Sequence, residues 1–261
     1  MKVLTWNINH RVKEDPHQMA KGLLSLEPDI IVLTEYRPGV SHTSRESRRF
    51  FMEDLKLVGF SDPTISQGSK DENLVFIIAK THLIEGEIKA PVLTVTTRMG
   101  KTQETTSLPS NVLHVKAPEW GFDILGIRIP DYGKQDRLRR ASWDWLLEIS
   151  SKIKNDPFVI LGDFNADRDP SKSPAYYGNC IEKLVTDGWQ HAQPKTGSNF
   201  VTINGGWEKQ LDHIFLSRHF TYHSAEYISE NDGYVFAGKQ PGAMSDHAVL
   251  VVDADLEKNG V

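Results

Sequence analysis

The chain has 261 residues, 39% of them hydrophobic and 25% charged, and its formal net charge is −5 at pH 7. This composition excludes wholesale disorder, and the negative balance does not suit a protein that coats long polyanions. The longest apolar stretches, such as 74–79, are far too short to cross a bilayer. We therefore expect one domain of the larger α/β kind over residues 1–261, with no membrane partner.

The predicted elements alternate along the whole chain between short runs of β-favouring residues and stretches of helical period. The expected strands are 2–8, 29–34, 73–80, 92–97, 111–116, 122–129, 158–162, 200–204, 211–217, 222–229 and 248–254. The expected helices are 16–26, 44–57, 135–154 and 173–186. Many short strands interspersed with helices predict an α/β fold of two packed sheets with helices outside, a four-layer α/β/β/α sandwich. For residues 98–110, a lid and a disordered loop both remain open.

The N-terminal segment and the cysteine content both suit the cytoplasm. Residues 1–6 enter an apolar alternating segment directly, without a basic leader or an apolar signal core. The single cysteine, Cys180, excludes an internal disulfide and a multi-cysteine zinc site. We expect a cytoplasmic protein, and because nothing in the sequence demands a larger assembly, we expect a monomer.

The polar residues that stand out lie where apolar strands begin or end, so that the backbone can present their side chains to a cleft. They are Asn7, Asn9, Glu35, Asp163, Asn165, Asp212, His213, Asp246 and His247. One carboxylate at such a place is more often a solvated turn or helix-cap residue. If the strand ends converge, however, the four carboxylates form an acidic pocket that a hard cation stabilises, and oxygen ligands favour magnesium.

Five short motifs hold these residues in a fixed order along the chain. They are Thr5-Trp6-Asn7-Ile8-Asn9, Thr34-Glu35, Gly162-Asp163-Phe164-Asn165, Leu211-Asp212-His213-Ile214-Phe215 and Ser245-Asp246-His247. In this order they resemble the endonuclease/exonuclease/phosphatase superfamily, the exonuclease III and DNase I group, over nearly the whole chain. The resemblance implies a DNase I-like sandwich of two mostly antiparallel sheets. It also implies a metal-dependent hydrolase that cleaves phosphodiester bonds.

The same resemblance assigns roles to individual residues. Glu35, helped by Asp246 and by nearby Asn7, would bind the metal, which is magnesium with manganese as the alternative. Asp163 would orient or deprotonate the attacking water, a role that requires a carboxylate within hydrogen-bond reach of that water. Asn165 would hold a phosphate oxygen.

A histidine–carboxylate pair and an arginine complete the implied catalytic set. His247, held by Asp212, would stabilise the pentacovalent charge or assist the leaving group. Arg128 takes the place where many DNA-repair members carry tyrosine or histidine, and a guanidinium is a good phosphate clamp. The following turn has Asp131 where the family pattern has asparagine. Both departures indicate a branch distinct from standard abasic-site repair enzymes.

Four further residues are predicted to contact a substrate: Asn9, Arg137, Arg140 and Trp207. Arginines bind phosphates and an exposed indole stacks on bases, so these residues favour a nuclease acting on DNA. The alternatives are a solvated helix face for the arginines and ordinary loop packing for Trp207. A phosphatase or phosphodiesterase acting on a small molecule, a lipid headgroup or a nucleic-acid adduct remains the second hypothesis, favoured by the net charge of −5 and by Arg128. An inactive binding module is the third.

Overall fold

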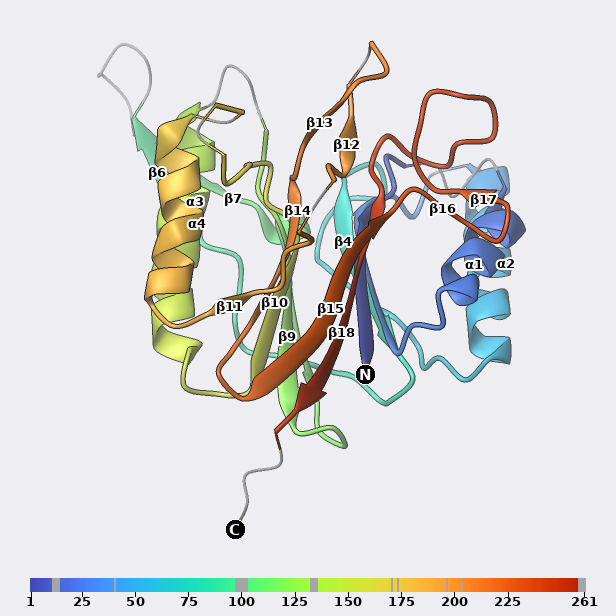
Figure 1. Cartoon of the computed structure of the whole chain (residues 1–261), viewed down its shortest axis with the longest axis horizontal. Coiled ribbons are helices and arrows are strands. Elements are labelled where there is room, and N and C mark those ends of the chain that lie inside the picture. Colours follow the sequence, from blue (N-terminus) through green and yellow to red (C-terminus); the bar gives the residue numbers. More distant parts are fainter. Residues whose placement is uncertain are drawn as a thin grey trace.

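Two six-stranded sheets pack face to face, and helices cover the outer side of each (Figure 1). This arrangement is seen in a computed structural model of the chain. The model describes residues 1–10, 15–39, 41–96, 103–131, 136–169, 171–172, 174–195, 197–202 and 204–257, with the backbone alone for 93–96, 103–107 and 136. None of the helices in these ranges combines the length and the apolar character needed to cross a membrane.

The first sheet has the strand order β15-β18-β1-β2-β4-β3. Its strands are β1 (Lys2–Asn7), β2 (Ile30–Tyr36), β3 (Thr64–Ile65), β4 (Leu74–Ala79), β15 (Phe220–Ile228) and β18 (Val249–Leu256). Strand β1 pairs parallel to β2 and antiparallel to β18. Strands β1 and β18, which are far apart in the sequence, therefore lie side by side in the middle of one sheet.

The second sheet has the order β11-β14-β10-β9-β8-β5. Its strands are β5 (Ile84–Glu85), β8 (Val112–Ala117), β9 (Phe122–Arg128), β10 (Phe158–Asp163), β11 (Gln190–His191) and β14 (Asp212–Leu216). Strand β10 runs parallel to β9 and antiparallel to β14. Asp163 and Asp212 are opposite each other in that register, so the last residue of one strand meets the first of the next.

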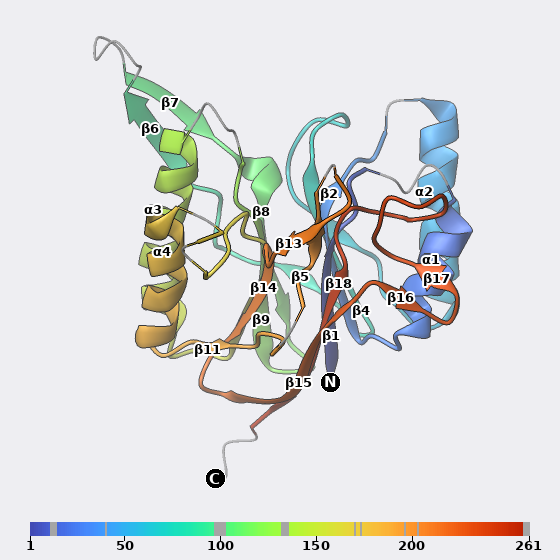
Figure 2. The ribbon, with the colours of Figure 1, turned by 45° about the horizontal axis from the view of Figure 1, so that its top comes forward.

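The remaining elements cover the sheets or project beyond them. Helices α1 (Pro16–Ser25) and α2 (His42–Leu57) cover the first sheet, and α3 (Asp136–Ile153) and α4 (Ala175–Thr186) cover the second (Figure 1). Three two-stranded ribbons are formed by β6 (Val92–Thr96) with β7 (Gln103–Ser107), β12 (Phe200–Val201) with β13 (Trp207–Lys209), and β16 (Glu230–Asn231) with β17 (Tyr234–Val235). A 3-10 turn, Pro109–Asn111, precedes β8. Figure 2 shows the β6–β7 ribbon projecting past the end of α3.

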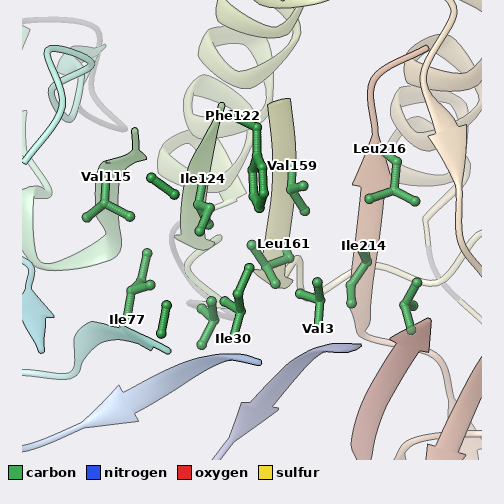
Figure 3. Packing of buried hydrophobic residues seen from close by; sticks show 14 of the residues in the cluster. Val3, Ile30, Ile77, Val115, Phe122, Ile124, Val159, Leu161, Ile214 and Leu216 are labelled. Atoms are coloured by element: carbon green, nitrogen blue, oxygen red, sulfur yellow. The ribbon is translucent and has the colours of Figure 1, made fainter. Parts of the chain in front are cut away.

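The core has three apolar layers because successive residues of a strand point to opposite faces of its sheet. In β1, Val3 packs between the two sheets, whereas Leu4 and Trp6 face the helices. In β10, Val159 and Leu161 face the first sheet from the other side. Figure 3 shows this inter-sheet layer, where side chains from both sheets interdigitate. Strands buried on both faces explain the unbroken apolar runs in the sequence.

The predicted four-layer sandwich is confirmed, and the differences lie at element ends. Helix α2 begins two residues before the predicted start, because Ser41 caps it by accepting a hydrogen bond from the Ser44 backbone N–H at 3.1 Å. The predicted strand 200–204 is paired only over Phe200–Val201, since the chain turns back with Thr202 N donating to Gly206 O at 2.9 Å. Residues 103–107 form strand β7, so a disordered loop is wrong for that part of 98–110, and the lid stays a prediction. Residues 97–102 lie outside the described ranges.

Candidate active site

A polar cleft of about 380 Å³ opens where the catalytic candidates meet. Strand β1 brings Asn7 to it from the first sheet, and β10 brings Asp163 from the second. The lining residues are Asn7, Asn9, Glu35, Arg128, Asp131, Arg139, Asp163, Asn165, Pro174, Phe200, Lys209, Leu211, Asp246 and His247. The strand ends therefore converge as the sequence predicts.

Asp163 is a buried carboxylate held by three donors. Its Oδ2 accepts hydrogen bonds from Asn7 Nδ2 at 2.9 Å and Asn165 Nδ2 at 3.1 Å, and its Oδ1 accepts from the Asn165 backbone N–H at 2.9 Å. Burial, together with the negative charge of Asp212, raises the pKa of Asp163 to about 7. A carboxylate with a pKa in this range can exchange a proton with water near neutral pH.

Local backbone geometry explains the residue type at each end of the turn from Gly162 to Asn165. Gly162 has φ +141°, and a Cβ there would meet the Ile127 carbonyl oxygen at 1.9 Å, so a side chain would break the pairing of β10 with β9. Asn165 adopts the left-handed region with φ +49°, which asparagine tolerates. Its Nδ2 donates to Ile129 O at 2.7 Å as well as to Asp163. The side-chain amide therefore joins Asp163 to the Ile129 backbone, and its contact with a phosphate oxygen stays a prediction.

Asp212 and His247 form a buried pair. His247 Nδ1 lies 2.7 Å from Asp212 Oδ2, and Asn199 Nδ2 donates to the same oxygen. Burial opposes a charge on His247, but the attraction of Asp212 outweighs it and raises the pKa of His247 to about 9. The imidazole is therefore cationic at neutral pH, and its Nε2 can act as a donor in the cleft.

A set of hydrogen bonds ties this pair to β1. Ser245 Oγ donates to Asn7 O at 2.6 Å and accepts from the His247 backbone N–H at 3.1 Å. Trp6 Nε1 donates to His247 O at 2.6 Å. The serine of the Ser245-Asp246-His247 motif thus fixes the position of the histidine relative to Asn7.

Glu35 is bound to Arg128. Its Oε1 accepts from Arg128 Nη2 at 2.8 Å and from Nε at 3.2 Å, while Oε2 lies 3.5 Å from His10 Nε2. Burial disfavours the ionised carboxylate, but the charge and hydrogen bonds of Arg128 together with the nearby His10 and His247 outweigh this effect and lower the pKa of Glu35. Glu35 has φ +56° at a register shift between Leu33 and Tyr36, so a bulge within β2, and not a strand end, turns it into the cleft.

The oxygen donors of the cleft fit a hard divalent cation. Glu35 and Asp246 contribute two carboxylates, and Asn9 Nδ2 orients Asp246 by donating to its Oδ1 at 3.1 Å. Within the described part of the chain, no three His, Cys, Asp or Glu side chains are grouped closely enough to hold a metal. A site with two carboxylates that leaves the other positions to amide, water and substrate oxygens matches the preference of magnesium.

The predicted substrate contacts occupy different places. Asn9 lines the cleft, whereas Arg137 and Arg140 are exposed on α3 outside it, with Arg140 over the Tyr176 ring at 4.6 Å. Trp207 lines a neighbouring pocket. Their contacts with a substrate stay predictions.

Three residues of the site were missed as site residues by the sequence analysis. Arg139, between the predicted Arg137 and Arg140, lines the cleft with its guanidinium 3.2 Å from Asp131 and 4.0 Å from the Tyr177 ring centre. Lys209 lines it because it pairs with Phe200 across the β12–β13 ribbon, which no sequence pattern signals. Asn199 lies in a loop without any motif.

The fold and the site define a class of protein, namely a two-sheet α/β sandwich with a carboxylate-rich cleft at the ends of its strands. The Endonuclease/Exonuclease/phosphatase family model matches residues 4–247, and the chain belongs to this family. Its members are hydrolases of phosphate esters and generally use divalent metals. No curated protein sequence matches the chain.

Solved structures of similar fold have diverse substrates. An AP endonuclease from Archaeoglobus fulgidus aligns with TM-score 0.69 and 17% identity over 98% of this chain and 100% of its own. The human Nocturnin catalytic domain with bound sulfate aligns with TM-score 0.59 and 18% identity over 98% and 93%. A mannosyl-6-phosphatase from Bacteroides thetaiotaomicron aligns with TM-score 0.65 and 16% identity over 98% and 100%. At these identities the likeness shows the fold alone.

Proposed function

We propose that this protein is a magnesium-dependent hydrolase that cleaves phosphodiester bonds in nucleic acid, with DNA as the expected substrate. One observation carries the proposal. The Asn7–Asp163–Asn165 cluster and the Asp212–His247 pair, which come from different motifs, open into the same cleft. A proton acceptor and a cationic proton donor thus share one polar space, as hydrolysis of a phosphoester requires.

The residues divide the reaction between them. Asp163 takes a proton from water as the water oxygen bonds to phosphorus, and Asn7 and Asn165 hold the carboxylate in position. His247 stabilises the charge of the pentacovalent species and gives a proton to the oxygen that leaves, while Asp212 holds the imidazole. Arg128 clamps a non-bridging phosphate oxygen. Magnesium, or manganese in its place, would be held by Glu35, Asp246 and Asn7 and would neutralise phosphate charge as a Lewis acid.

Nucleic acid is favoured because Arg139 and Lys209 add two cations to the cleft beside Arg128. Each can pair with a phosphodiester anion, and a strand supplies several such anions in a row. The net charge of −5 belongs to the whole chain and does not fix the sign at the cleft, where a bound cation also counts. We further propose that the protein acts as a cytoplasmic, single-domain monomer.

Hydrolysis of a small phosphate ester is the second candidate. The observation in its favour is that Arg137 and Arg140, predicted to bind a polymer, lie outside the cleft. A cleft of about 380 Å³ also falls within the size range of small-molecule sites.

Purified protein should be incubated with supercoiled plasmid, an abasic-site duplex, single-stranded DNA, RNA and bis-p-nitrophenyl phosphate, each with magnesium and with EDTA. We expect magnesium-dependent cleavage of DNA that is lost in Asp163→Asn. Hydrolysis of the small ester alone would transfer the proposal to the second candidate. Inactivity toward every substrate would contradict both and favour the binding module.

A further inference from the structure

A second pocket of about 320 Å³ lies beside the catalytic cleft. Its lining residues are Val201, Gly205, Trp207, Ser229, Glu230, Val235, Ala237, Gly238, Lys239 and Gln240. None of these residues lines the cleft itself, so the two spaces are separate.

The β12–β13 ribbon is the partition between them. Phe200 pairs with Lys209 across the ribbon, and both line the catalytic cleft. Val201 pairs with Trp207, and both line the second pocket. Phe200 and Val201 are neighbours in β12, so they point to opposite faces of the ribbon. A register shift between them pairs one with Lys209 and the other with Trp207, so one cross-strand pair lines each space. A chain-like ligand that crosses the ribbon would occupy both.

The ribbon and the far wall of the second pocket are both fixed to the segment that carries Asp246 and His247. Val201 N donates to Asp246 O at 2.8 Å, and Gly238 N donates to Ser245 O at 3.1 Å. Phe200 and Ala237 form β-bridges with His247 and Ser245. The second pocket is therefore hydrogen-bonded to Asp246, a predicted metal ligand, and to Ser245 beside it.

The pocket offers an aromatic face with polar groups around it. Trp207 is 45% exposed, whereas the other five tryptophans are buried or half-buried. The flat face of an exposed indole suits stacking against a planar ring. Glu230 and Gln240 place hydrogen-bonding groups at the same pocket, and exposed Lys239 adds a positive charge.

We propose that this second pocket binds the base of the nucleotide next to the scissile phosphate, stacked on Trp207. Glu230 and Gln240 then face the edge of the base, and Lys239 faces the next phosphate of the strand. The inference rests on the proposed function, since it takes nucleic acid as the substrate and the catalytic cleft as the place of the scissile phosphate. It places substrate contacts outside that cleft and assigns a role to the segment 229–240.

The test measures binding separately from cleavage. A fluorescein-labelled single-stranded oligodeoxynucleotide is titrated with protein in EDTA and followed by anisotropy, for the parent, Trp207→Ala and the control Tyr222→Ala. Tyr222 is a suitable control because it is 37% exposed on β15 and lines neither pocket. The same titrations use a strand of equal length built from abasic nucleotides. Thermal unfolding establishes that all variants are folded.

We expect Trp207→Ala to bind the normal strand about tenfold more weakly, which is the size of one base–aromatic stack. The abasic strand should bind to this variant and to the parent with the same affinity, and Tyr222→Ala should match the parent on both strands. Equal affinity of Trp207→Ala and parent for the normal strand would overturn the proposal, as would an equal loss on both strands.

The two proposals fail differently. If the parent cleaves no nucleic acid but Trp207-dependent binding of the normal strand persists, the catalytic proposal fails and the base pocket stands. If the parent cleaves DNA and Trp207→Ala binds it normally, the base pocket fails and the catalytic proposal stands. A parent that binds neither strand overturns the pocket.

Discussion

Replacing Asp163 by asparagine is the sharpest test of the catalytic assignment, because its structural cost can be worked out. The NH₂ group of the new asparagine can replace Oδ1, which accepts from one backbone N–H, or Oδ2, which accepts from two side-chain donors. The first orientation leaves the buried Asn165 N–H without an acceptor, which costs about 1–3 kcal/mol of unfolding free energy. Removal of a buried carboxylate, whose pKa is raised to about 7, offsets part of this cost. For a chain of this size the melting temperature should then fall by about 5 °C at most.

Activity should fall far more than stability. Loss of a positioned general base lowers turnover by about 10²–10⁴-fold. The assay is the initial rate on the best substrate at saturating magnesium, beside melting temperatures for parent and variant. Activity of Asp163→Asn within threefold of the parent would refute the reasoning.

Asp167→Asn is the matched control for this substitution. Asp167 is also buried and accepts backbone hydrogen bonds at 2.8 Å from Asp169 and from Gln210, but it does not line the cleft. Its variant should lose similar stability and keep its activity. An equal loss of activity would assign the effect of Asp163→Asn to the loop and not to the base.

Three further predictions follow from the site and its surroundings. His247→Ala should remove most activity while the protein stays folded, so full turnover by this variant would contradict its role. Arg128→Ala should bind Mn²⁺ at least threefold more tightly by calorimetry, because the guanidinium that competes for Glu35 is gone; weaker binding would contradict this competition. Burial, the neighbouring His213 and the Arg168 charge lower the pKa of His191, and burial lowers that of His213 despite Asp212 and Asp167. As the pH falls, the unfolded chain therefore binds protons on these histidines before the folded chain does. The free energy of unfolding, measured with urea, should decrease below about pH 6.5 by up to about 1.4 kcal/mol per pH unit for each histidine. His191→Gln should lose less stability than the parent between pH 7.5 and 5.5.

Hydrophobic periodicity is enough to predict most of the sandwich, because long strands buried on both faces have apolar runs that nothing else explains. Strands such as β1 and β10 lie within a residue of their predicted ends. Strands β13, β16 and β17 could not be predicted, since runs of two or three residues are held by their surroundings. The bulge at Glu35 was also invisible, because it depends on the register of β2 against β4.

The motifs locate the proposed catalytic residues, but not their partners. Asp163, Asp212 and His247 share one site as the motifs indicate. The contacts of Asn199 with Asp212, and of Arg128 with Glu35, join segments far apart in the sequence. Only the folded chain brings such segments together. The sequence alone therefore predicts the reactive groups but not the contacts that hold them in place.

The pairing of β1 with β18 has a consequence for biosynthesis. Asn7 is synthesised more than 230 residues before the serine and histidine that complete its surroundings. A chain still emerging from the ribosome, or one truncated before Ser245, therefore lacks the assembled site. Premature termination should yield inert fragments, and the first turnover of each molecule must wait until its last strand has docked beside its first.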